Sequence, residues 1–357
     1  MKVSILGDGL TSLTLAKMLV NLGISTDIFF NKKKKKNNRI QTLGISKTNI
    51  DFFNNYILNI NKLLWDINSI EIFSEKLDNE KILDFTNKNN QLFSIIRNTD
   101  LYKSLFFSLK KNKLVNFKKN IDYQTLIKKK YQLIFNCNYS HTISRKYFYK
   151  KIDKDYNSYA YVTTFKHAKL KNNHTASQIF TKVGPIAFLP ISSTETSVVY
   201  SVKSVRNVNL NEFIKNYNRK YKIHSINHVL KYKLNSSNLR SYYHKNIIAF
   251  GDMLHKLHPL AGQGFNMTIR DVNEIFNLIK IKIENGLDLD TSICSDFEKN
   301  TKNRNYLFSN GIDLIYEFFN FENKINNNSL SKSVKFLGQN KLINNFFIKF
   351  ADNGIRF

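Results

Sequence analysis

The segment with the clearest chemical pattern runs from Gly251 to Val272 and reads GDMLHKLHPLAGQGFNMTIRDV. It holds three of the twelve glycines and one of the three prolines of a 357-residue chain. The rest of the chain is rich in lysine, asparagine, isoleucine and phenylalanine. The segment also carries a carboxylate, Asp252, and two histidines, His255 and His258. Because glycine lets a backbone come close to a ligand, this pattern predicts a ligand-binding loop.

The two histidines could bind a metal ion, since they lie three residues apart and near Asp252. However, His258 is followed by Pro259, and no cysteine or further acidic residue nearby completes a ligand set. We therefore expect no metal here. His258 fits a hydrogen-bonding role in the loop or a place near a substrate.

A strand and a helix flank this loop. Ile247–Phe250 is a short apolar run that predicts a buried strand, and apolar residues recur at helical spacing through Ile269–Ile283. Gly262 and Gly264 clear side chains from the loop. Asn266 falls in the first helical turn, where backbone N–H groups are unpaired. An anionic or electron-rich ligand fits such a helix end.

A second junction of the same kind opens the chain. Val3–Leu6 predicts a strand, Gly7 and Gly9 a turn, Leu13–Leu22 a helix, and Ile28–Phe30 a second strand. This order within about thirty residues is typical of a dinucleotide-binding fold. Gly7 allows the tight turn and Gly9 lets backbone N–H groups approach a pyrophosphate, which the helix N-terminus attracts.

Two positions of this junction depart from the dinucleotide-binding pattern. Ser12 stands where a third glycine is usual, and Phe30 and Asn31 stand where an acidic residue binds a ribose hydroxyl. Asn31 can bond a hydroxyl, without the strength of a charged acceptor. Taken alone, the junction leaves an ordinary βαβ unit open as an alternative.

Together, these motifs resemble those of the FAD-dependent aromatic hydroxylases. The similarity is greatest to the ubiquinone-biosynthesis ring hydroxylases, which are relatives of p-hydroxybenzoate hydroxylase, and it extends over nearly the whole chain. The matching segments are Gly251-Asp252, HPLAGQG at 258–264 with Asn266, Arg270 and Asp271, Arg39 before TLGIS, VGPIAFLPI at 183–191, NGIDLIYEFF at 310–319 and FADNGIRF at 350–357.

This resemblance implies a cofactor, a reaction and a set of site residues. The cofactor is FAD, NAD(P)H is the electron donor, and dioxygen supplies an oxygen atom to an electron-rich phenolic ring. Asp252 is implied as the acceptor for ribityl hydroxyls, and Arg39 lies by the phosphates or the ribityl chain. His258 and Pro259 are implied on the catalytic side. The implied cofactor-binding positions are Gly7, Gly9, Ser12, Asn31, Arg39, Gly251, Asp252, Gly262, Gln263, Gly264 and Asn266.

One segment in the middle of the chain departs from the family. Cys137, Asn138 and Tyr139 replace its Ala-Asp-Gly, Thr142 replaces its serine, and Arg145 matches its arginine. Two hypotheses remain. The chain is a ring hydroxylase with weakened or compensated FAD binding, or it is a non-catalytic, flavin-deficient relative that acts as a subunit or lipid-binding partner in ubiquinone biosynthesis.

The net charge of +28 supports a third hypothesis, nucleic-acid binding, only weakly. The enriched residue types have AT-rich codons, the lysines are spread along the chain, and the run Lys32–Lys36 reads as a solvated loop. The chain lacks a recognised nucleic-acid motif, so we expect no nucleic-acid partner.

The remaining sequence features concern location and partners. The chain has only two cysteines, and we find neither a signal peptide nor an apolar run near the roughly 18 residues of a membrane span. These features predict a reduced, cytoplasmic protein. A polyprenylated phenol substrate lies in the bilayer. Contact with the inner face of the membrane and membership of a ubiquinone-biosynthesis complex therefore fit the resemblance. Apolar residues at helical spacing from Phe336 to Phe350, with Lys341 and Lys349 among them, read as a core helix or as a membrane-contacting surface.

The predicted fold is α/β. It combines a Rossmann-like FAD-binding domain with an inserted β-sheet substrate domain and C-terminal helices, as in p-hydroxybenzoate hydroxylase. We assign residues 1–65, 96–150 and 236–300 to the FAD domain, 66–95 and 151–235 to the substrate domain, and 301–357 to the helical segment.

Overall fold

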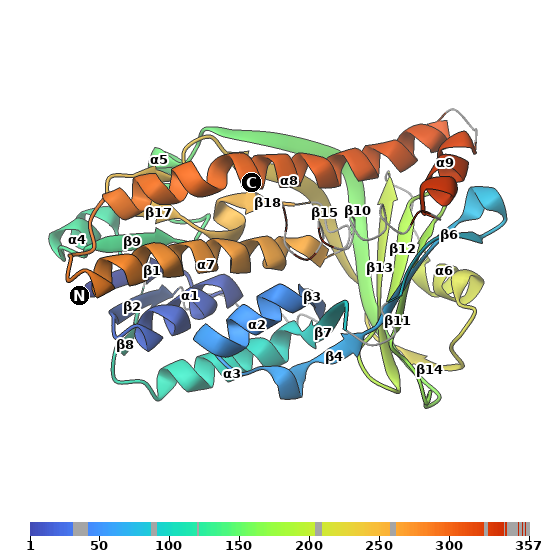
Figure 1. The fold of residues 1–357 in the computed structure, drawn as a ribbon, viewed down its shortest axis with the longest axis horizontal. Coiled ribbons are helices and arrows are strands. Elements are labelled where there is room, and N and C mark those ends of the chain that lie inside the picture. Colours follow the sequence, from blue (N-terminus) through green and yellow to red (C-terminus); the bar gives the residue numbers. More distant parts are fainter. Residues whose placement is uncertain are drawn as a thin grey trace.

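The computed structural model describes residues 1–30, 42–86, 91–119, 121–203, 209–257, 262–324 and 328–338, and the single positions Asn340, Lys349, Asp352 and Gly354. A mainly parallel sheet with its helices lies at one end of the molecule, and a larger, mainly antiparallel sheet stands at the other (Figure 1).

The parallel sheet contains both of the predicted strands that precede the glycine turns. Its strand order is β16-β17-β9-β1-β2-β8, and only the β16–β17 pair is antiparallel. Central strands such as β1 read as apolar runs because both faces are covered. The bounds are β1 (Lys2–Leu6), β2 (Ser25–Phe30), β8 (Val115–Lys119), β9 (Leu133–Asn136), β16 (Tyr243–His244) and β17 (Ile247–Ala249).

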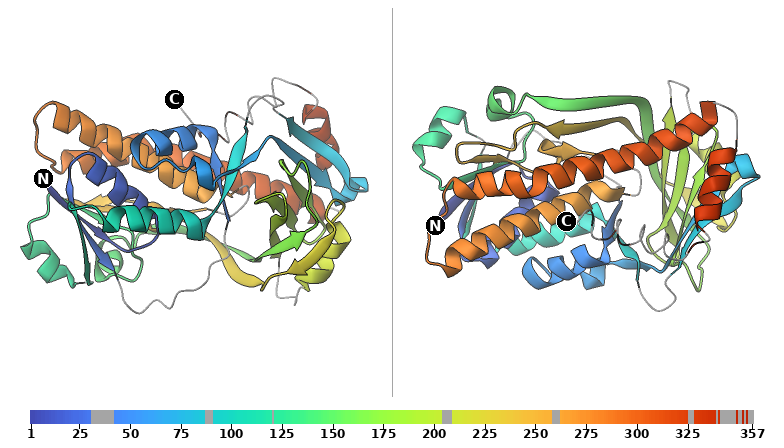
Figure 2. Two further views of the ribbon diagram at one scale, coloured as in Figure 1. Left: turned by 90° about the horizontal axis from the view of Figure 1, so that it is seen from below. Right: turned by 45° about the horizontal axis from the view of Figure 1, so that its top comes forward.

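Helices cover this sheet and form the largest apolar core with it. Helix α1 packs against α3 and α7, and α7 lies alongside the long helix α8 (Figure 2). Gly23, with φ of +78°, follows the last residues of α1, as expected for a glycine that ends a helix. The bounds are α1 (Leu10–Asn21), α3 (Asn98–Lys110), α4 (Tyr123–Lys128), α5 (Thr142–Tyr147), α7 (Gln263–Glu284) and α8 (Ser292–Lys324).

The larger sheet has the strand order β18-β15-β10-β13-β12-β11-β5-β6, with β14 paired to β10. Helix α6 (Leu210–Tyr217) covers its outer face through one apolar cluster. The strand bounds are β5 (Ser69–Ser74), β6 (Glu80–Thr86), β10 (Lys151–His167), β11 (Thr175–Phe180), β12 (Pro185–Pro190), β13 (Glu195–Lys203), β14 (Ile223–Ile226), β15 (Leu230–Leu239) and β18 (His255–Lys256).

A small third sheet, β3-β7-β4, links the two ends of the molecule. Strand β3 packs against α7, and the Oγ1 of Thr42 in β3 donates a hydrogen bond to the Oγ of Ser197 in β13 (3.0 Å). Its bounds are β3 (Thr42–Ser46), β4 (Trp65–Ile67) and β7 (Phe93–Arg97). The remaining elements are α2 (Lys47–Tyr56), α9 (Ser329–Gly338) and the short turns η1 (Asn61–Leu63), η2 (Glu75–Leu77) and η3 (Gly251–Met253).

Several expected elements coincide with observed ones. The strand expected at Ile247–Phe250 is β17, and the helix expected near Gly264 is α7. Helix α8 begins at Ser292, before the boundary drawn at residue 301, and the division into domains stays a proposal.

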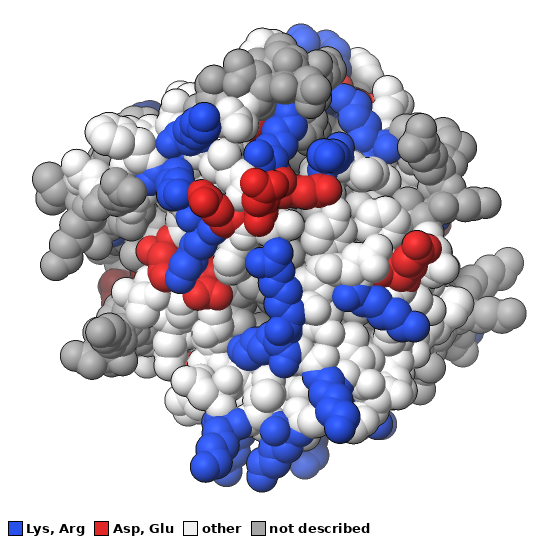
Figure 3. Space-filling view, turned by 90° about the vertical axis from the view of Figure 1, so that its right-hand side faces the viewer, with Lys and Arg blue, Asp and Glu red and all other residues white. Residues whose placement is uncertain are grey.

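Charged side chains are dispersed over the end of the molecule that holds the larger sheet. Figure 3 shows that lysine and arginine side chains on this face are separated by uncharged residues and interrupted by aspartates and glutamates. Within the described ranges, none of the helices combines the length and the apolar composition needed to cross a bilayer.

Candidate active site

The two glycine junctions meet at one edge of the parallel sheet. Strands β1 and β17 both pair in parallel with β9, so their carboxyl ends lie at the same edge, one on each side of β9. The chain continues from β1 to its other neighbour, β2, which makes this edge a switch point in strand order, where α/β sheets bind ligands. Helices α1 and α7 pack together behind the edge.

At the first junction, the two glycines differ in how much space surrounds them: Gly7 is closely packed, whereas Gly9 faces open space. Gly7 has φ of +118°, and a Cβ there would lie 3.2 Å from the Oγ of Ser12, which is fully buried. Gly9 precedes α1, and a Cβ there would meet nothing within 4 Å. The backbone at Gly9 therefore borders free space, as a pyrophosphate site requires.

The second junction begins with a glycine that touches the first. Gly251 has φ of +64°, and a Cβ there would lie 2.5 Å from Cγ2 of Thr11. Only glycine suits both the left-handed backbone and this close approach. The exposed Asp252 follows directly, so its carboxylate leaves the sheet beside the start of α1.

The start of α7 carries the second group of predicted residues. Gly262 has φ of +62° and lies against the backbone of Gly44 in β3, since a Cβ would be 3.7 Å from the Gly44 nitrogen. A Cβ on Gly264 would meet nothing within 4 Å. Next to it, the buried Oε1 of Gln263 lacks a hydrogen-bond partner in the described part of the chain. An open helix end with an unsatisfied acceptor fits a ligand that has N–H or O–H groups.

Asn266 fixes the start of α7 to β3 and α2. Its Oδ1 accepts hydrogen bonds from the backbone N–H of Ser46 and from Nδ2 of Asn49, both at 2.9 Å. Its Nδ2 donates to the carbonyl of Gly44 at 2.9 Å. The side chain is 2% exposed, so Asn266 positions the loop through protein contacts.

The segment after β9 completes the edge. The N–H of Cys137 donates to the carbonyl of Leu6 at 3.0 Å, and the Cys137 carbonyl lies beside Gly7. Burial, with a smaller contribution from the charge of Asp252, raises the pKa of Cys137 to about 12, so the thiol stays protonated. Hydrogen bonds from Asn136 to Ser144 and from Ser144 to the Asn138 carbonyl brace the turn.

His255 is part of a buried hydrogen-bond network. Its Nε2 lies 2.5 Å from Oδ2 of Asp271, whose Oδ1 accepts from Nδ2 of Asn305 at 2.9 Å. Within the described residues, no three His, Cys, Asp or Glu side chains are grouped to hold a metal ion. His255 therefore ties β18 to α7 and α8.

The structure brings together Gly7, Gly9, Ser12, Gly251 and Asp252, and it places Gly262, Gln263, Gly264 and Asn266 at the adjoining start of α7. Asn31, Arg39, His258 and Pro259 lie outside the described residues, and the role of every site residue stays a prediction. Sequence reasoning did not single out Thr11, Gly44 or Asn49. The TLGIS match pointed to the right strand, but no local signal marks Thr11 or Asn49, whose importance depends on contacts distant in sequence.

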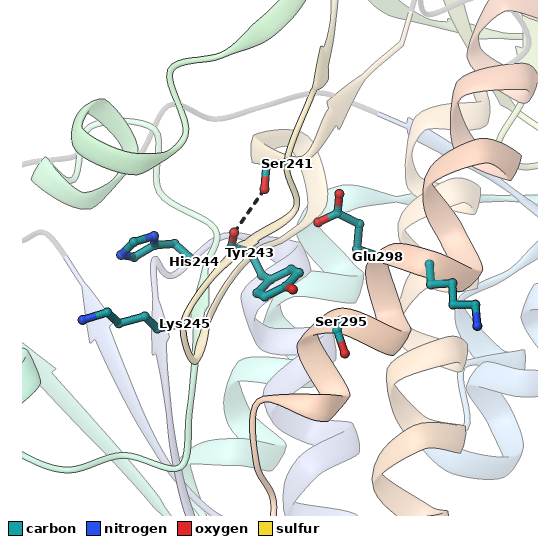
Figure 4. A pocket seen from close by; sticks show the side chains of 7 residues that line it. Ser241, Tyr243, His244, Lys245, Ser295 and Glu298 are labelled. Carbon is teal, nitrogen blue, oxygen red and sulfur yellow. Dashed lines mark hydrogen bonds between the residues drawn. The ribbon is translucent and has the colours of Figure 1, made fainter.

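A cavity of about 530 Å³ lies elsewhere, between the β16–β17 hairpin and the first turns of α8 (Figure 4). Glu298 points toward the hairpin and accepts a hydrogen bond from the N–H of Tyr242 at 3.1 Å. The hairpin residues precede β17, so this cavity lies at the end of that strand remote from Gly251 and belongs to a different part of the surface.

Comparison with known proteins identifies relatives in sequence. A family model described as squalene epoxidase matches residues 130–324, more than half of the chain. Ubiquinone biosynthesis monooxygenase COQ6, mitochondrial, of Schizosaccharomyces pombe is 22% identical over 56% of this chain and 52% of its own length. The 3-demethoxyubiquinol 3-hydroxylase of Escherichia coli is 25% identical over 40% of this chain and 39% of its own length. The chain thus spans about half the length, or less, of these curated relatives.

Solved structures share the fold over nearly the entire chain. The p-nitrophenol 4-monooxygenase PnpA of Pseudomonas putida covers 99% of this chain and 98% of its own, with a TM-score of 0.79 and 10% identity. HpxO of Klebsiella pneumoniae, solved with FAD and uric acid, covers 98% and 96%, with a TM-score of 0.73 and 11% identity. The predicted fold class is confirmed, and the relatives confirm the resemblance on which it rested.

Proposed function

Because the chain belongs to the squalene epoxidase family and resembles the ubiquinone-biosynthesis ring hydroxylases, we propose that it is an FAD-dependent monooxygenase. Its substrate would be the aromatic ring of a polyprenylated ubiquinone precursor, with NAD(P)H as the electron donor. The observation that carries this proposal is the meeting of two strand–glycine–helix junctions at one sheet edge, with open backbone at Gly9 and at Gly264.

The described residues fit a flavin dinucleotide in two places. The free space at Gly9 and the N-terminus of α1 suit the pyrophosphate. The open start of α7, with the unsatisfied Oε1 of Gln263, suits a ring that carries N–H and carbonyl groups. Asp252, exposed between the two, would accept hydrogen bonds from ribityl hydroxyls.

In such an enzyme, bound flavin would supply the redox chemistry that activates dioxygen and hydroxylates the ring. The residues of this chain would position and shield the reactants. The positive end of α7 would stabilise negative charge at the ring edge that it faces. Asn266 would hold that helix end in register with β3, and the apolar cluster that contains Leu257 and Met267 would exclude water.

The direct test of this function has two stages. Purified protein should be yellow, and it should release FAD on denaturation. The chain should then restore ubiquinone synthesis in one of a set of strains that each lack one ring hydroxylase, and the intermediate that disappears identifies the ring position. A colourless protein that stays colourless after refolding with excess FAD supports the non-catalytic, flavin-deficient relative instead.

We also propose peripheral contact with the inner face of a membrane, where a polyprenylated phenol would be met. Large apolar side chains are exposed along α8 and α9, with Leu314 at 71%, Phe321 at 56% and Phe336 at 75% exposure. Binding to anionic liposomes should fall when Lys341 and Lys349 are both replaced by glutamate, while flavin content is retained. Equal binding by the double variant rejects this contact.

A further inference from the structure

The inner face of the large sheet, which looks toward α7 and β3, is accessible at its centre. Side chains of β12 alternate between faces. Ile186 and Phe188 are buried in the cluster under α6, whereas Ala187 and Leu189, on the inner face, are only half-buried. Figure 1 shows β11 and β12 standing between α6 and the start of α7. A central strand with half-buried side chains on its inner face indicates an unfilled space there.

A row of three residues crosses this space. Gln178 of β11 is paired with Ala187, and Ala187 is paired with Val199 of β13, so the three side chains share one face. All three are half-buried although their strands are interior to the sheet. Ala187, at the middle of the row, is small enough to leave room for a ligand ring.

Apolar clusters flank the row on both sides along the strand direction. Phe180, two residues after Gln178 on β11, belongs to a cluster with Leu257 and with Met267 of the first turns of α7. Ala176, two residues before Gln178 on β11, belongs to a cluster with Leu189 and Trp65. The row therefore lies between the start of α7 and an apolar wall.

Strand β3 connects this face to the candidate cofactor site. Thr42 is hydrogen-bonded to Ser197, which lies on the inner face of β13, and Gly44 lies against Gly262. A molecule held at the row would thus sit next to the loop that is proposed to hold the flavin.

Gln178 is the polar group of this row. Within the described residues its amide has no hydrogen-bond partner, because the neighbouring side chains are apolar or small. A half-buried amide of this kind is bonded to water until a ligand replaces that water, and the ligand must then supply equivalent hydrogen bonds. A glutamine amide both donates and accepts, so it matches a phenolic hydroxyl or an ether oxygen.

The charge of this face restricts the ligand further. The inner-face residues near the row are uncharged, namely Gln178, Ala187, Leu189, Ser197 and Val199. Glu195, at the end of β13, is already paired with Arg97. A ring bearing a carboxylate would be desolvated here without a free cation among these residues, which is costly.

We propose that Gln178 is a specificity-determining residue that hydrogen-bonds the oxygen substituent of a neutral phenolic ring, and that the site rejects rings that carry a carboxylate. This inference deepens the proposed function and rests on it. The substrate class is then a prenylated phenol that has already lost, or never carried, a ring carboxylate.

The test measures ligand binding to the full chain, with and without added FAD, through the fluorescence of Trp65. This is the single tryptophan of the chain, and it lies in the cluster beside the row. The probes are ortho-prenylphenol and its para-carboxylated counterpart. In the unaltered chain we expect the neutral probe to bind at least about tenfold more tightly. Gln178→Leu, which keeps the side-chain size, should weaken that binding about tenfold.

The control variant is Ser177→Ala, whose side chain lies on the opposite face of the same strand, and it should bind both probes as the unaltered chain does. Gln178→Met provides a second apolar replacement if the leucine variant does not fold. Unchanged binding of the neutral probe by a folded Gln178 variant, or equal binding of the two probes by the unaltered chain, overturns the inference. FAD uptake is measured separately, and its absence rejects the proposed function without affecting the Trp65 titration.

Discussion

The two glycine junctions have the same plan but differ in how completely they match it. At the β1–α1 junction, a serine replaces the third glycine, and its Oγ fills the space beside Gly7. At the β17–α7 junction, all the predicted glycines are present, and Asn266 makes three hydrogen bonds that fix the helix start. We therefore expect the second junction to contribute more to the positioning of a flavin than the first.

This difference shows which positions of the two junctions have room for a side chain and which do not. Ser12 is buried in α1 and can be accommodated because serine is small and Gly9 keeps the backbone beside it open. Gly251 has no such freedom, because its left-handed backbone and the side chain of Thr11 both exclude a Cβ. Substitutions at the second junction should therefore cost more than those at the first.

The largest effect is expected for Gly251→Ala. The new Cβ adds left-handed strain of about 1–2 kcal/mol and a clash with Thr11 of about 1–2 kcal/mol. Unfolding in urea should show a loss of about 2–4 kcal/mol. The additional change Thr11→Ala should recover part of the loss. Gly262→Ala is the matched control, since it has the same backbone strain but only a 3.7 Å contact, and it should lose about half as much.

Asn266→Ala should follow in size. It leaves the Ser46 N–H and the Gly44 carbonyl without their buried partner, at a cost of about 1–3 kcal/mol. Both the melting temperature and FAD affinity should fall, because the start of α7 is no longer fixed to β3. If stability falls but FAD affinity is retained, the second junction does not position the flavin.

Asp252→Ala should weaken FAD binding by roughly ten- to a hundredfold, since a hydrogen bond to a charged acceptor contributes about 1.5–3 kcal/mol. Asp252 is exposed, so the melting curve of the apoprotein should change little. The opposite result, a lower melting temperature with FAD affinity intact, would assign Asp252 to capping its loop.

The smallest effect is expected for Ser12→Gly, which restores the third glycine. Removing the Oγ beside Gly7 should strengthen FAD binding by at most a few-fold, while helix α1 loses about 0.5 kcal/mol of intrinsic stability. A large gain in FAD affinity would show that the first junction limits FAD binding. That result would contradict the expectation that the second junction contributes more to the positioning of a flavin.

The parts of this site that sequence could predict are those set by local pattern. Glycine spacing, apolar strands and helical periodicity located both junctions, and β1, α1, β17 and α7 lie where they indicated. The contacts that join the junctions could not be predicted, because they depend on which strands become neighbours in the sheet. Thr11 against Gly251 and Asn49 against Asn266 join residues more than 200 positions apart in the chain.

The same limit applied to His255. Its spacing from His258 allowed a metal site, while the structure pairs it with Asp271, sixteen residues away on α7. Gln178 carried no sequence signal, because a glutamine in a strand is informative only once both faces of the sheet are known. The alternation of β12 separates a buried from an accessible face only because α6 covers one side of the sheet.

The most direct test of the central claim is a titration of the unaltered apoprotein with FAD, followed by flavin absorbance and fluorescence. The account predicts saturable binding of one FAD per chain, with Gly264→Val, which fills the open start of α7, abolishing it without unfolding the protein. Absence of saturable binding by the unaltered chain, or full binding by the folded Gly264→Val variant, would contradict the placement of a flavin between the two junctions.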